Sequence, residues 1–572
     1  MLSKRIVGSC AAALVLSVAG FAATADIADA VMKGDKAAVR TLLNQKADVN
    51  APQADGATAL HWAVFRDDLE TADLLIRAGA NVSARNRPGM TPLSLAAVNG
   101  SAPMIGKLLA AGADANERLA NGETALMMAS RTGKVDAMKA LIDRGADVNA
   151  VENLRGTTAL MWASAQEHPA AVKYLIERGA DMKVRSKAVP IGRGPYLAPT
   201  PKERIQQVAG GTQNFIQGEQ PLAGGGSNQP AGVEVGGGGG GAVRGITNKD
   251  DPNQAGGLTA MVFAARQGDL ETVKVFVDAG ADVNQVTQYG WSPLLAATKN
   301  GYYTVAKYLI EKGADVNLAN KGGWTPLYLA TDNRNIEGGD YPTRKPDIDH
   351  LEFMKYLLDK GANPNARMID STETRTIFTH QWLYEDGATA LLRAAQSGDI
   401  ALIRLLLQYG ADPLVKTENG DTALMVASGI GWVEGVTREL SPAETLETVK
   451  LLLEKGSDVN AINGELRNAL HGAAHKGRND VVQLLVDHGA DIQANDIGSR
   501  DTAAGHLIGR TFIPLDYAEG LVRVGVQSAI PHPETAALLR KLMSERGIPL
   551  PAVNRDPRSI CITAACAPPA NQ

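Results

Sequence analysis

The sequence predicts an all-α solenoid of about twelve helix–turn–helix units with projecting turns. Three observations lead to this fold class: a glycine recurs at a fixed period, a residue that can cap a helix recurs in phase with it, and apolar residues at helical spacing lie between them. Most successive gaps between the glycines are 33 or 34 residues. The glycines are Gly79, Gly112, Gly145, Gly179, Gly280, Gly313, Gly361, Gly410, Gly456 and Gly489.

Each unit begins with a residue whose side chain can accept a hydrogen bond from a free backbone N–H, which stabilises a helix by about 1 kcal/mol. A short helix with Leu and Ala on one face follows, then a second helix that ends at the glycine, where a left-handed conformation is favourable. A polar "ADVN" turn leads to the next unit. The predicted caps are Thr58, Thr91, Thr124, Thr158, Thr259, Ser292, Thr325, Thr389, Thr422 and Asn468.

This pattern, with "TPL" and "AA" in the first helix and "GADVN" after the second, resembles the ankyrin repeat. The resemblance covers roughly Asp26 to Pro549 apart from inserts, and it is weakest at the ends, where Lys46 replaces the glycine and Ile513 the cap. It implies a scaffold that binds a protein partner and that is not an enzyme. It also implies that the projecting turns, or fingers, and the first helices line the binding groove.

Longer gaps in the period indicate inserts and give the expected domain boundaries. We expect a signal peptide in 1–25, repeats one to five in 26–187, a flexible Gly-rich insert in 188–255, repeats six to twelve with loop inserts in 256–549, and a tail in 550–572. The long insert carries a run of six glycines and few apolar residues, so we expect it to be disordered. The two repeat blocks either stack or are joined by a flexible break.

The first residues have the pattern of a cleaved secretory signal. Lys4 and Arg5 precede an apolar run from Ile6 to Phe21, and small residues at Ala23 and Ala25 suit a cleavage site. We therefore expect export from a bacterial cell to the periplasm or the medium, with no membrane span after cleavage. An uncleaved membrane anchor is the alternative.

Composition and motifs argue against several functions. A net charge of −5 without a basic block disfavours binding to nucleic acid. The sequence contains no GxSxG, HExxH or GxxxxGK[ST] motif. His471 and His475 are four residues apart, a spacing that suits a metal pair, but no third ligand is near and we expect no metal or cofactor. Nothing indicates oligomers, so we expect a monomer.

Two cysteines remain after removal of the signal, Cys561 and Cys566 in the tail. In an oxidising compartment they can form a small disulfide. Two free thiols in a flexible tail are the alternative.

Aromatic residues suggest where a partner binds. Trp291 and Trp324 lie in successive fingers, Tyr289 is beside the first, and Trp382 lies in the next finger's insert. On turns that face solvent these side chains would form a binding hot spot. The alternative is that each tryptophan folds against the adjacent finger. By contrast, we expect the tryptophans inside first helices, Trp62 and Trp162, to pack in the core.

The sequence therefore predicts an exported scaffold that binds a protein through fingers and first helices. One alternative is a secreted effector that acts on another cell. Another is an enzyme or ligand site built from the inserts, which contain His350, His380 and several carboxylates.

Overall fold

A computed structural model describes residues 26–190, 254–335, 345–369, 383–433, 437–497, 511–524, 527–528 and 530–552. The predicted signal peptide, most of the Gly-rich insert, Trp382, His380 and both tail cysteines lie outside these residues. The chain divides into two compact units, and the division follows Asp181. Each unit is described separately below.

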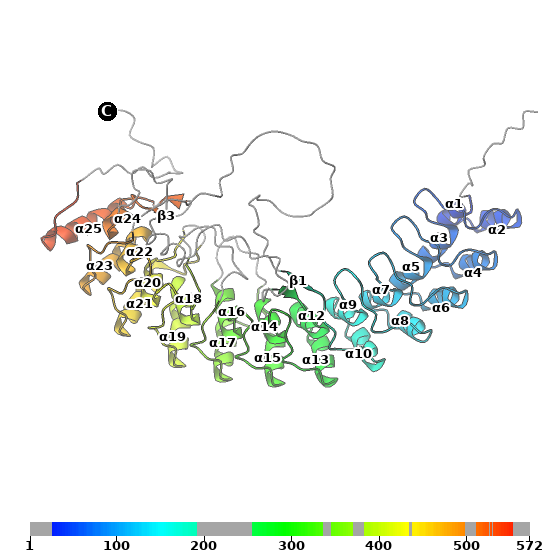
Figure 1. The fold of residues 1–572 in the computed structure, drawn as a ribbon, viewed down its shortest axis with the longest axis horizontal. Coiled ribbons are helices and arrows are strands. Elements are labelled where there is room, and N and C mark those ends of the chain that lie inside the picture. The colour runs from blue at the N-terminus through cyan, green and yellow to red at the C-terminus, as the bar shows by residue number, and fades with distance from the viewer. Residues whose placement is uncertain are drawn as a thin grey trace, which may run out of the picture. The chain divides into compact units, whose positions relative to one another are not determined.

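Unit 1 consists of consecutive helix pairs, as the repeat predicts. The first helices pack on one another in chain order, and so do the second helices from α4 onward (Figure 1). The helices are α1 (Asp26–Lys33), α2 (Lys36–Asn44), α3 (Ala59–Phe65), α4 (Leu69–Arg77), α5 (Pro92–Asn99), α6 (Ala102–Ala110), α7 (Ala125–Arg131), α8 (Val135–Ile142), α9 (Ala159–Ala165) and α10 (Pro169–Glu177).

Unit 2 continues the same arrangement of pairs from α12 to α25. Its first helices again form one row within the unit, from α12 to α24. The helices are α12 (Ala260–Gln267), α13 (Leu270–Asp278), α14 (Pro293–Lys299), α15 (Tyr303–Glu311), α16 (Pro326–Arg334), α17 (His350–Asp359), α18 (Ala390–Gln396), α19 (Ile400–Gln408), α20 (Ala423–Ser428), α21 (Pro442–Glu454), α22 (Ala469–Lys476), α23 (Asn479–Asp487), α24 (Pro514–Ala518) and α25 (Pro533–Glu545).

The predicted helix starts and stops are confirmed. Every predicted cap residue is the N-cap of a first helix, and Thr91, for example, accepts a hydrogen bond from the Ser94 N–H at 3.1 Å. The period glycines have left-handed backbones, with φ of 90° at Gly79. A Cβ there would meet nothing within 4 Å, so the backbone conformation and not lack of space favours glycine. Lys46 adopts the same conformation, with φ of 58°.

The repeated Asn of "ADVN" links neighbouring repeats. The Asn116 side chain donates to the Gly145 carbonyl at 2.8 Å and accepts from the Asp147 N–H at 2.7 Å. Asn317 makes the same two contacts in unit 2, with Gly361 and Asn363. The sequence indicates only that these residues belong to a polar turn. The structure adds that they satisfy the carbonyl at the end of the next repeat.

Two short antiparallel sheets accompany the helices in unit 2. β1 (Ala188–Pro190) pairs with β2 (Gln254–Gly256), which brings the two ends of the long insert together. β3 (Arg523–Val524) pairs with β4 (Gln527–Ser528) in the connection between α24 and α25. The Ser186 N–H also donates to the Leu258 carbonyl, and the Leu258 N–H donates to Ser186 Oγ, each at 2.9 Å. These contacts bond Ser186 and β1 to residues that follow the long insert, within unit 2.

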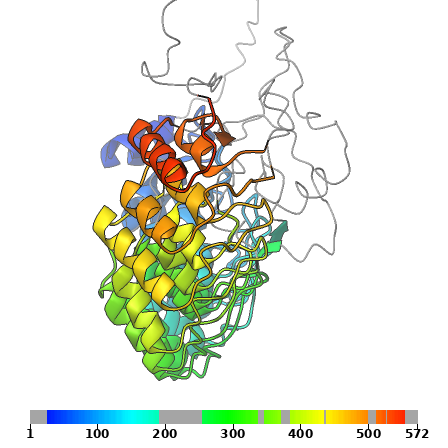
Figure 2. The ribbon, with the colours of Figure 1, turned by 90° about the vertical axis from the view of Figure 1, so that its left-hand side faces the viewer.

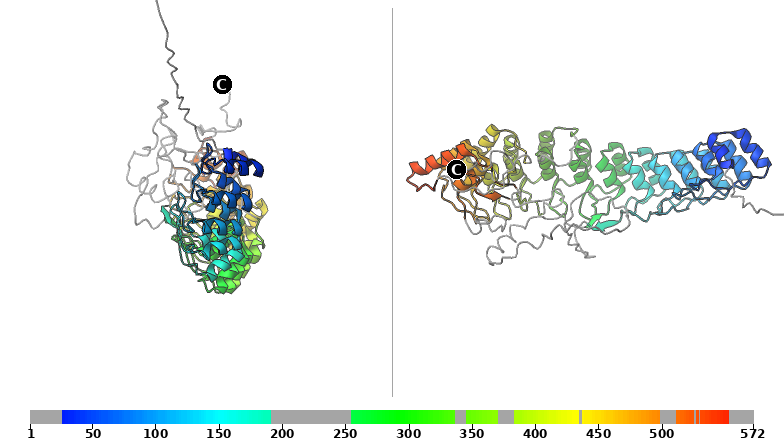
Figure 3. Two further views of the ribbon diagram at one scale, coloured as in Figure 1. Left: turned by 90° about the vertical axis from the view of Figure 1, so that its right-hand side faces the viewer. Right: turned by 90° about the horizontal axis from the view of Figure 1, so that it is seen from above.

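The remaining long connections lie where the repeat spacing placed them. Three separate the two helices of a pair, after α16, α20 and α24, and two lie in fingers, before α18 and before α24. Within each unit the fingers project from one side of the helices, as Figure 2 shows for unit 2 and the left panel of Figure 3 for unit 1. The fingers and the first helices therefore share a face in each unit.

Candidate protein-binding faces

We compare two positions in each first helix, the fourth and seventh residues after the cap; in α3 and α9 the fourth residue, Trp62 or Trp162, bonds to a finger residue. They are three residues apart and so lie on the same side of the helix. In unit 1 these positions are largely apolar and only partly covered. They are Trp62 and Phe65 in α3, Leu95 and Val98 in α5, Met128 and Arg131 in α7, and Trp162 and Ala165 in α9.

The first-helix face of unit 1 exposes large apolar side chains on adjacent helices. Phe65 is 62% exposed and Val98 41%, and Met32, which lies 33 residues before Phe65 in α1, is 37% exposed. Because α1, α3, α5 and α7 pack in order, these residues and the partly exposed Met128 lie along one strip. Adjacent exposed apolar groups of this kind mark interaction surfaces in soluble proteins.

Trp62 and Trp162 belong to this face, and the expectation that they pack in the core is wrong. Both are partly exposed. The Trp62 indole N–H donates to Gln53 Oε1 at 2.6 Å, and its ring contacts Phe65 edge-on at 5.8 Å between centroids. The Trp162 N–H donates to Thr157 Oγ1 at 2.7 Å. Fixed aromatic rings that remain accessible are well suited to act as binding anchors.

In unit 2 the same helix positions become covered. Phe263 in α12 is still partly exposed, but from α14 onward the fourth position is buried. Inserted residues provide the cover: Leu383 from the finger insert lies in one buried cluster with Leu329 of α16 and Val426 of α20. The sequence gave no signal that Leu383, at the end of the finger insert before α18, packs onto these helices.

The predicted aromatic fingers are mostly buried. Trp324 is 0% exposed and Tyr289 is 5% exposed, so the expectation that they face solvent is wrong. Trp324 packs edge-on against Tyr328, with 5.1 Å between ring centroids. Trp291 is partly buried against the same cluster, and Trp382 lies outside the described residues. The alternative that the tryptophan folds against its neighbours is correct for Trp324, because the next finger and its insert cover it.

His471 and His475 are structural in unit 2. His471 is the third residue of α22, where its Nδ1 accepts from the Asn468 backbone N–H at 3.1 Å and its Nε2 contacts the Phe512 carbonyl at 3.3 Å. Burial lowers the pKa of His471 to about 3 and that of His475 to about 4. The adjoining cavity, beside Trp432 and Tyr517, has room for about one water molecule.

The inserts do not assemble a metal site among the residues that the structure describes. No group of three or more His, Cys, Asp or Glu side chains there could hold an ion. His350 contacts the Tyr303 hydroxyl through Nδ1 at 2.8 Å, and burial, with a smaller contribution from the Arg334 charge, lowers its pKa to about 4.

Over the described ranges, no helix combines the length and apolar character needed to cross a bilayer.

Stacked helix pairs with one open apolar face define the class of helical-repeat scaffolds. The particular family follows from comparison: the model described as "Ankyrin repeats (3 copies)" matches residues 27–118, 93–186, 240–320, 261–368, 348–437 and 441–496. These segments cover more than half of the chain. The chain therefore belongs to the ankyrin-repeat family, whose repeats generally mediate protein–protein interactions and are typically not enzymatic.

Curated relatives match parts of the repeat array. Mouse ankyrin repeat domain-containing protein 63 is 36% identical over 112 residues, which are 19% of this chain and 26% of the relative. Alpha-latrocrustotoxin-Lt1a of Latrodectus tredecimguttatus is 29% identical over 147 residues, 26% of this chain and 8% of the toxin. Mouse ankyrin repeat and SOCS box protein 16 is 34% identical over 106 residues, 18% and 22% of the two chains. The matches thus span about a quarter or less of these relatives.

Proposed function

We propose that this protein is an exported scaffold that binds a partner protein through the first-helix face of unit 1 and the adjoining fingers. The observation that carries the proposal is the strip of accessible apolar residues at equivalent positions of neighbouring helices, with Phe65 and Val98 most exposed. Equivalent positions in most of unit 2 are buried, so the open face distinguishes unit 1. Burial of such side chains in an interface is favourable at about 25 cal/mol per Å².

Replacing Phe65 and Val98 together by Ser should reduce partner capture at least tenfold. Residues at the centre of an apolar interface commonly contribute 1–2 kcal/mol or more each, and about 1.4 kcal/mol corresponds to a factor of ten. The measurement is quantitative recovery of bound proteins from a cell-envelope extract on immobilised full chain. Both residues are exposed and neither belongs to the buried core, so the variant should keep its helical circular dichroism.

The matched control replaces Leu414 and Ile462 by Ser, since these apolar residues are 49% and 50% exposed but belong to unit 2. The control should capture the partner like the unchanged chain. Equal capture by the Phe65/Val98 variant would contradict this face, whereas equal loss in both variants would indicate non-specific adhesion.

We also propose that the chain is exported. The support is the positively charged start with Lys4 and Arg5, followed by the apolar run to Phe21 and small residues before Asp26. In a bacterial host the full chain should be recovered outside the cytoplasm with Asp26 as its first residue, as N-terminal sequencing of each cell fraction would show. Replacing Lys4 and Arg5 by Glu should retain the protein in the cytoplasm. If the unchanged chain is recovered only in the cytoplasm and uncleaved, export is refuted.

A further inference from the structure

One first helix of unit 2 carries a charge where the others are apolar. The fourth residue after the cap is Arg393 in α18, and its guanidinium is 0% exposed. In the neighbouring first helices the same position is Ala296, Leu329 or Val426. A buried guanidinium is costly unless carboxylates and carbonyls pair with it. The groups that pair with Arg393 therefore indicate which chemistry this helix face accepts.

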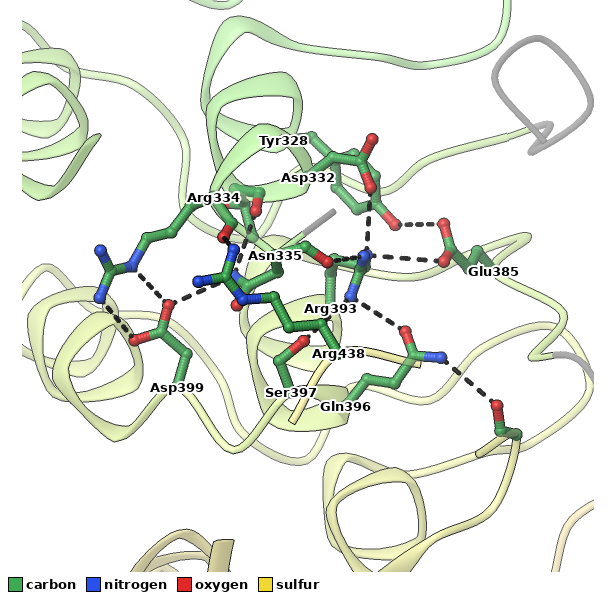
Figure 4. Close-up of polar contacts among 12 residues, drawn as sticks. Tyr328, Asp332, Arg334, Asn335, Glu385, Arg393, Gln396, Ser397, Asp399 and Arg438 are labelled. Carbon is green, nitrogen blue, oxygen red and sulfur yellow. Dashed lines mark hydrogen bonds and ion pairs between the residues drawn. The ribbon is translucent and has the colours of Figure 1, made fainter. Parts of the chain in front are cut away.

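Arg393 is paired from two sides (Figure 4). Within the helix stack, its Nε lies 3.1 Å from Asp332 Oδ1 of α16, its Nη1 donates to Gln396 Oε1 at 3.1 Å, and its Nη2 donates to the Asn335 carbonyl. From the finger insert, Glu385 Oε1 lies 3.7 Å from Arg393 Nε. The Asp332 carboxylate, on a neighbouring first helix, already balances the charge of Arg393. The Glu385 carboxylate, from the finger insert, is therefore a second acid beside the same guanidinium.

The insert segment that carries Glu385 contacts the face through several side chains. Leu383 packs with Leu329 and Val426 in the buried cluster. The Tyr328 hydroxyl donates to Glu385 Oε2 at 2.9 Å, and Glu385 itself is 1% exposed. These segment residues belong to no helix or strand. An irregular stretch with an apolar residue and, two positions later, a carboxylate thus covers the face.

We propose that Leu383–Glu385 is an internal ligand, and that the face it covers in unit 2 is a second binding site for an extended partner segment with the same chemistry. Such a segment places an apolar side chain on Leu329 and Val426 and a carboxylate beside Arg393 and the Tyr328 hydroxyl. This site is distinct from the open apolar face of unit 1 and does not depend on it. The partner segment competes with the chain's own insert for the site.

The guanidinium makes the site selective for an acid. Its planar N–H groups suit a carboxylate, and charge-assisted hydrogen bonds in a dry site are stronger than neutral ones. A partner with Gln in place of Glu removes the second carboxylate from beside Arg393, while Asp332 stays, and we expect this loss to cost at least a factor of ten in affinity. The tethered insert occupies the site at a high effective concentration, so weakening it increases the affinity for a free peptide.

The test uses the full chain and a fluorescein-labelled peptide with the sequence of residues 383–388, Leu-Tyr-Glu-Asp-Gly-Ala. Fluorescence polarisation should show that the Glu385→Gln chain binds this peptide at least tenfold more tightly than the unchanged chain does. The same variant should bind the peptide with Gln for Glu at least tenfold more weakly. Equal affinity for the two peptides, or no gain over the unchanged chain, would overturn the proposal.

Two further variants protect the test against a misfolded chain. Leu383→Ala removes only the insert's own apolar side chain and leaves the site unchanged, so it should also increase peptide affinity; if neither variant gains affinity, the site is not a binding site. In the Glu385→Gln background, Arg393→Met should abolish the preference for the acidic peptide. The matched control is Arg404→Met, because Arg404 is an exposed arginine of α19 paired with Glu447, and this change should leave the preference intact.

Discussion

Replacing Trp324 by Ala should lower the free energy of unfolding of unit 2 by about 3–5 kcal/mol, the usual cost of removing a fully buried large aromatic side chain. The indole is 0% exposed and lies in a cluster with Tyr328, Leu329 and Leu383. Its removal leaves a cavity between a finger, a first helix and an insert. Native-state hydrogen exchange of the amides in α16 and α18 measures the loss directly.

Trp291→Ala is the matched comparison for this substitution. Trp291 lies one repeat earlier, is only partly buried, and packs against the edge of the same cluster. Its replacement should cost clearly less than that of Trp324. A result in which Trp324→Ala changes stability by less than about 1.5 kcal/mol and reduces partner capture would contradict the burial of Trp324. It would instead support the hypothesis that this tryptophan faces solvent and binds the partner.

The stability of unit 2 should fall as the pH is lowered below about 6.5, by about 1.4 kcal/mol per pH unit from His471 alone. Burial lowers its folded-state pKa from 6.5 to about 3, with a smaller lowering from the Arg467 charge. Between these values the unfolded chain binds a proton that the folded chain excludes. The contribution of His471 is therefore complete above the unfolded pKa and is lost progressively down to about pH 3.

His471→Gln isolates this effect from the titration of carboxylates. Gln at the third helical position can still accept a hydrogen bond from the Asn468 N–H, so the capping interaction is retained. Between pH 4 and 6, urea unfolding monitored in unit 2 should show a slope reduced by about 1.4 kcal/mol per pH unit. An unchanged slope in the His471→Gln variant would mean that His471 is not buried as a neutral ring.

Local sequence patterns were enough to predict the helices and their ends. Thr91 caps a helix because its hydroxyl reaches a backbone N–H three residues away, and Gly79 ends one because its φ is positive. Both effects depend on neighbours in the chain, so they repeat wherever the residues repeat. The long connections were located for the same reason, since any addition to a fixed period shows as a longer gap.

The candidate sites were predicted less well, because burial depends on residues far apart in the sequence. "GWTPL" places Trp324 on a finger, but whether a finger side chain faces solvent depends on the insert that folds beside it. Likewise Trp62 and Trp324 are both tryptophans at regular repeat positions, yet one is accessible and the other is fully buried. No local pattern distinguishes them.

The sequence by itself determined the family, the helix pairs, their caps and stops, and the positions of the inserts, since these follow from period and short-range hydrogen bonding. Only the tertiary structure decided which face is open. Unit 1 leaves Phe65 and Val98 accessible, whereas in unit 2 Leu383 packs on the first-helix residues Leu329 and Val426, and Glu385 pairs with Arg393. The physical reason is that an exposed apolar residue becomes buried only when another segment of chain reaches it, and that contact is not encoded in the repeat.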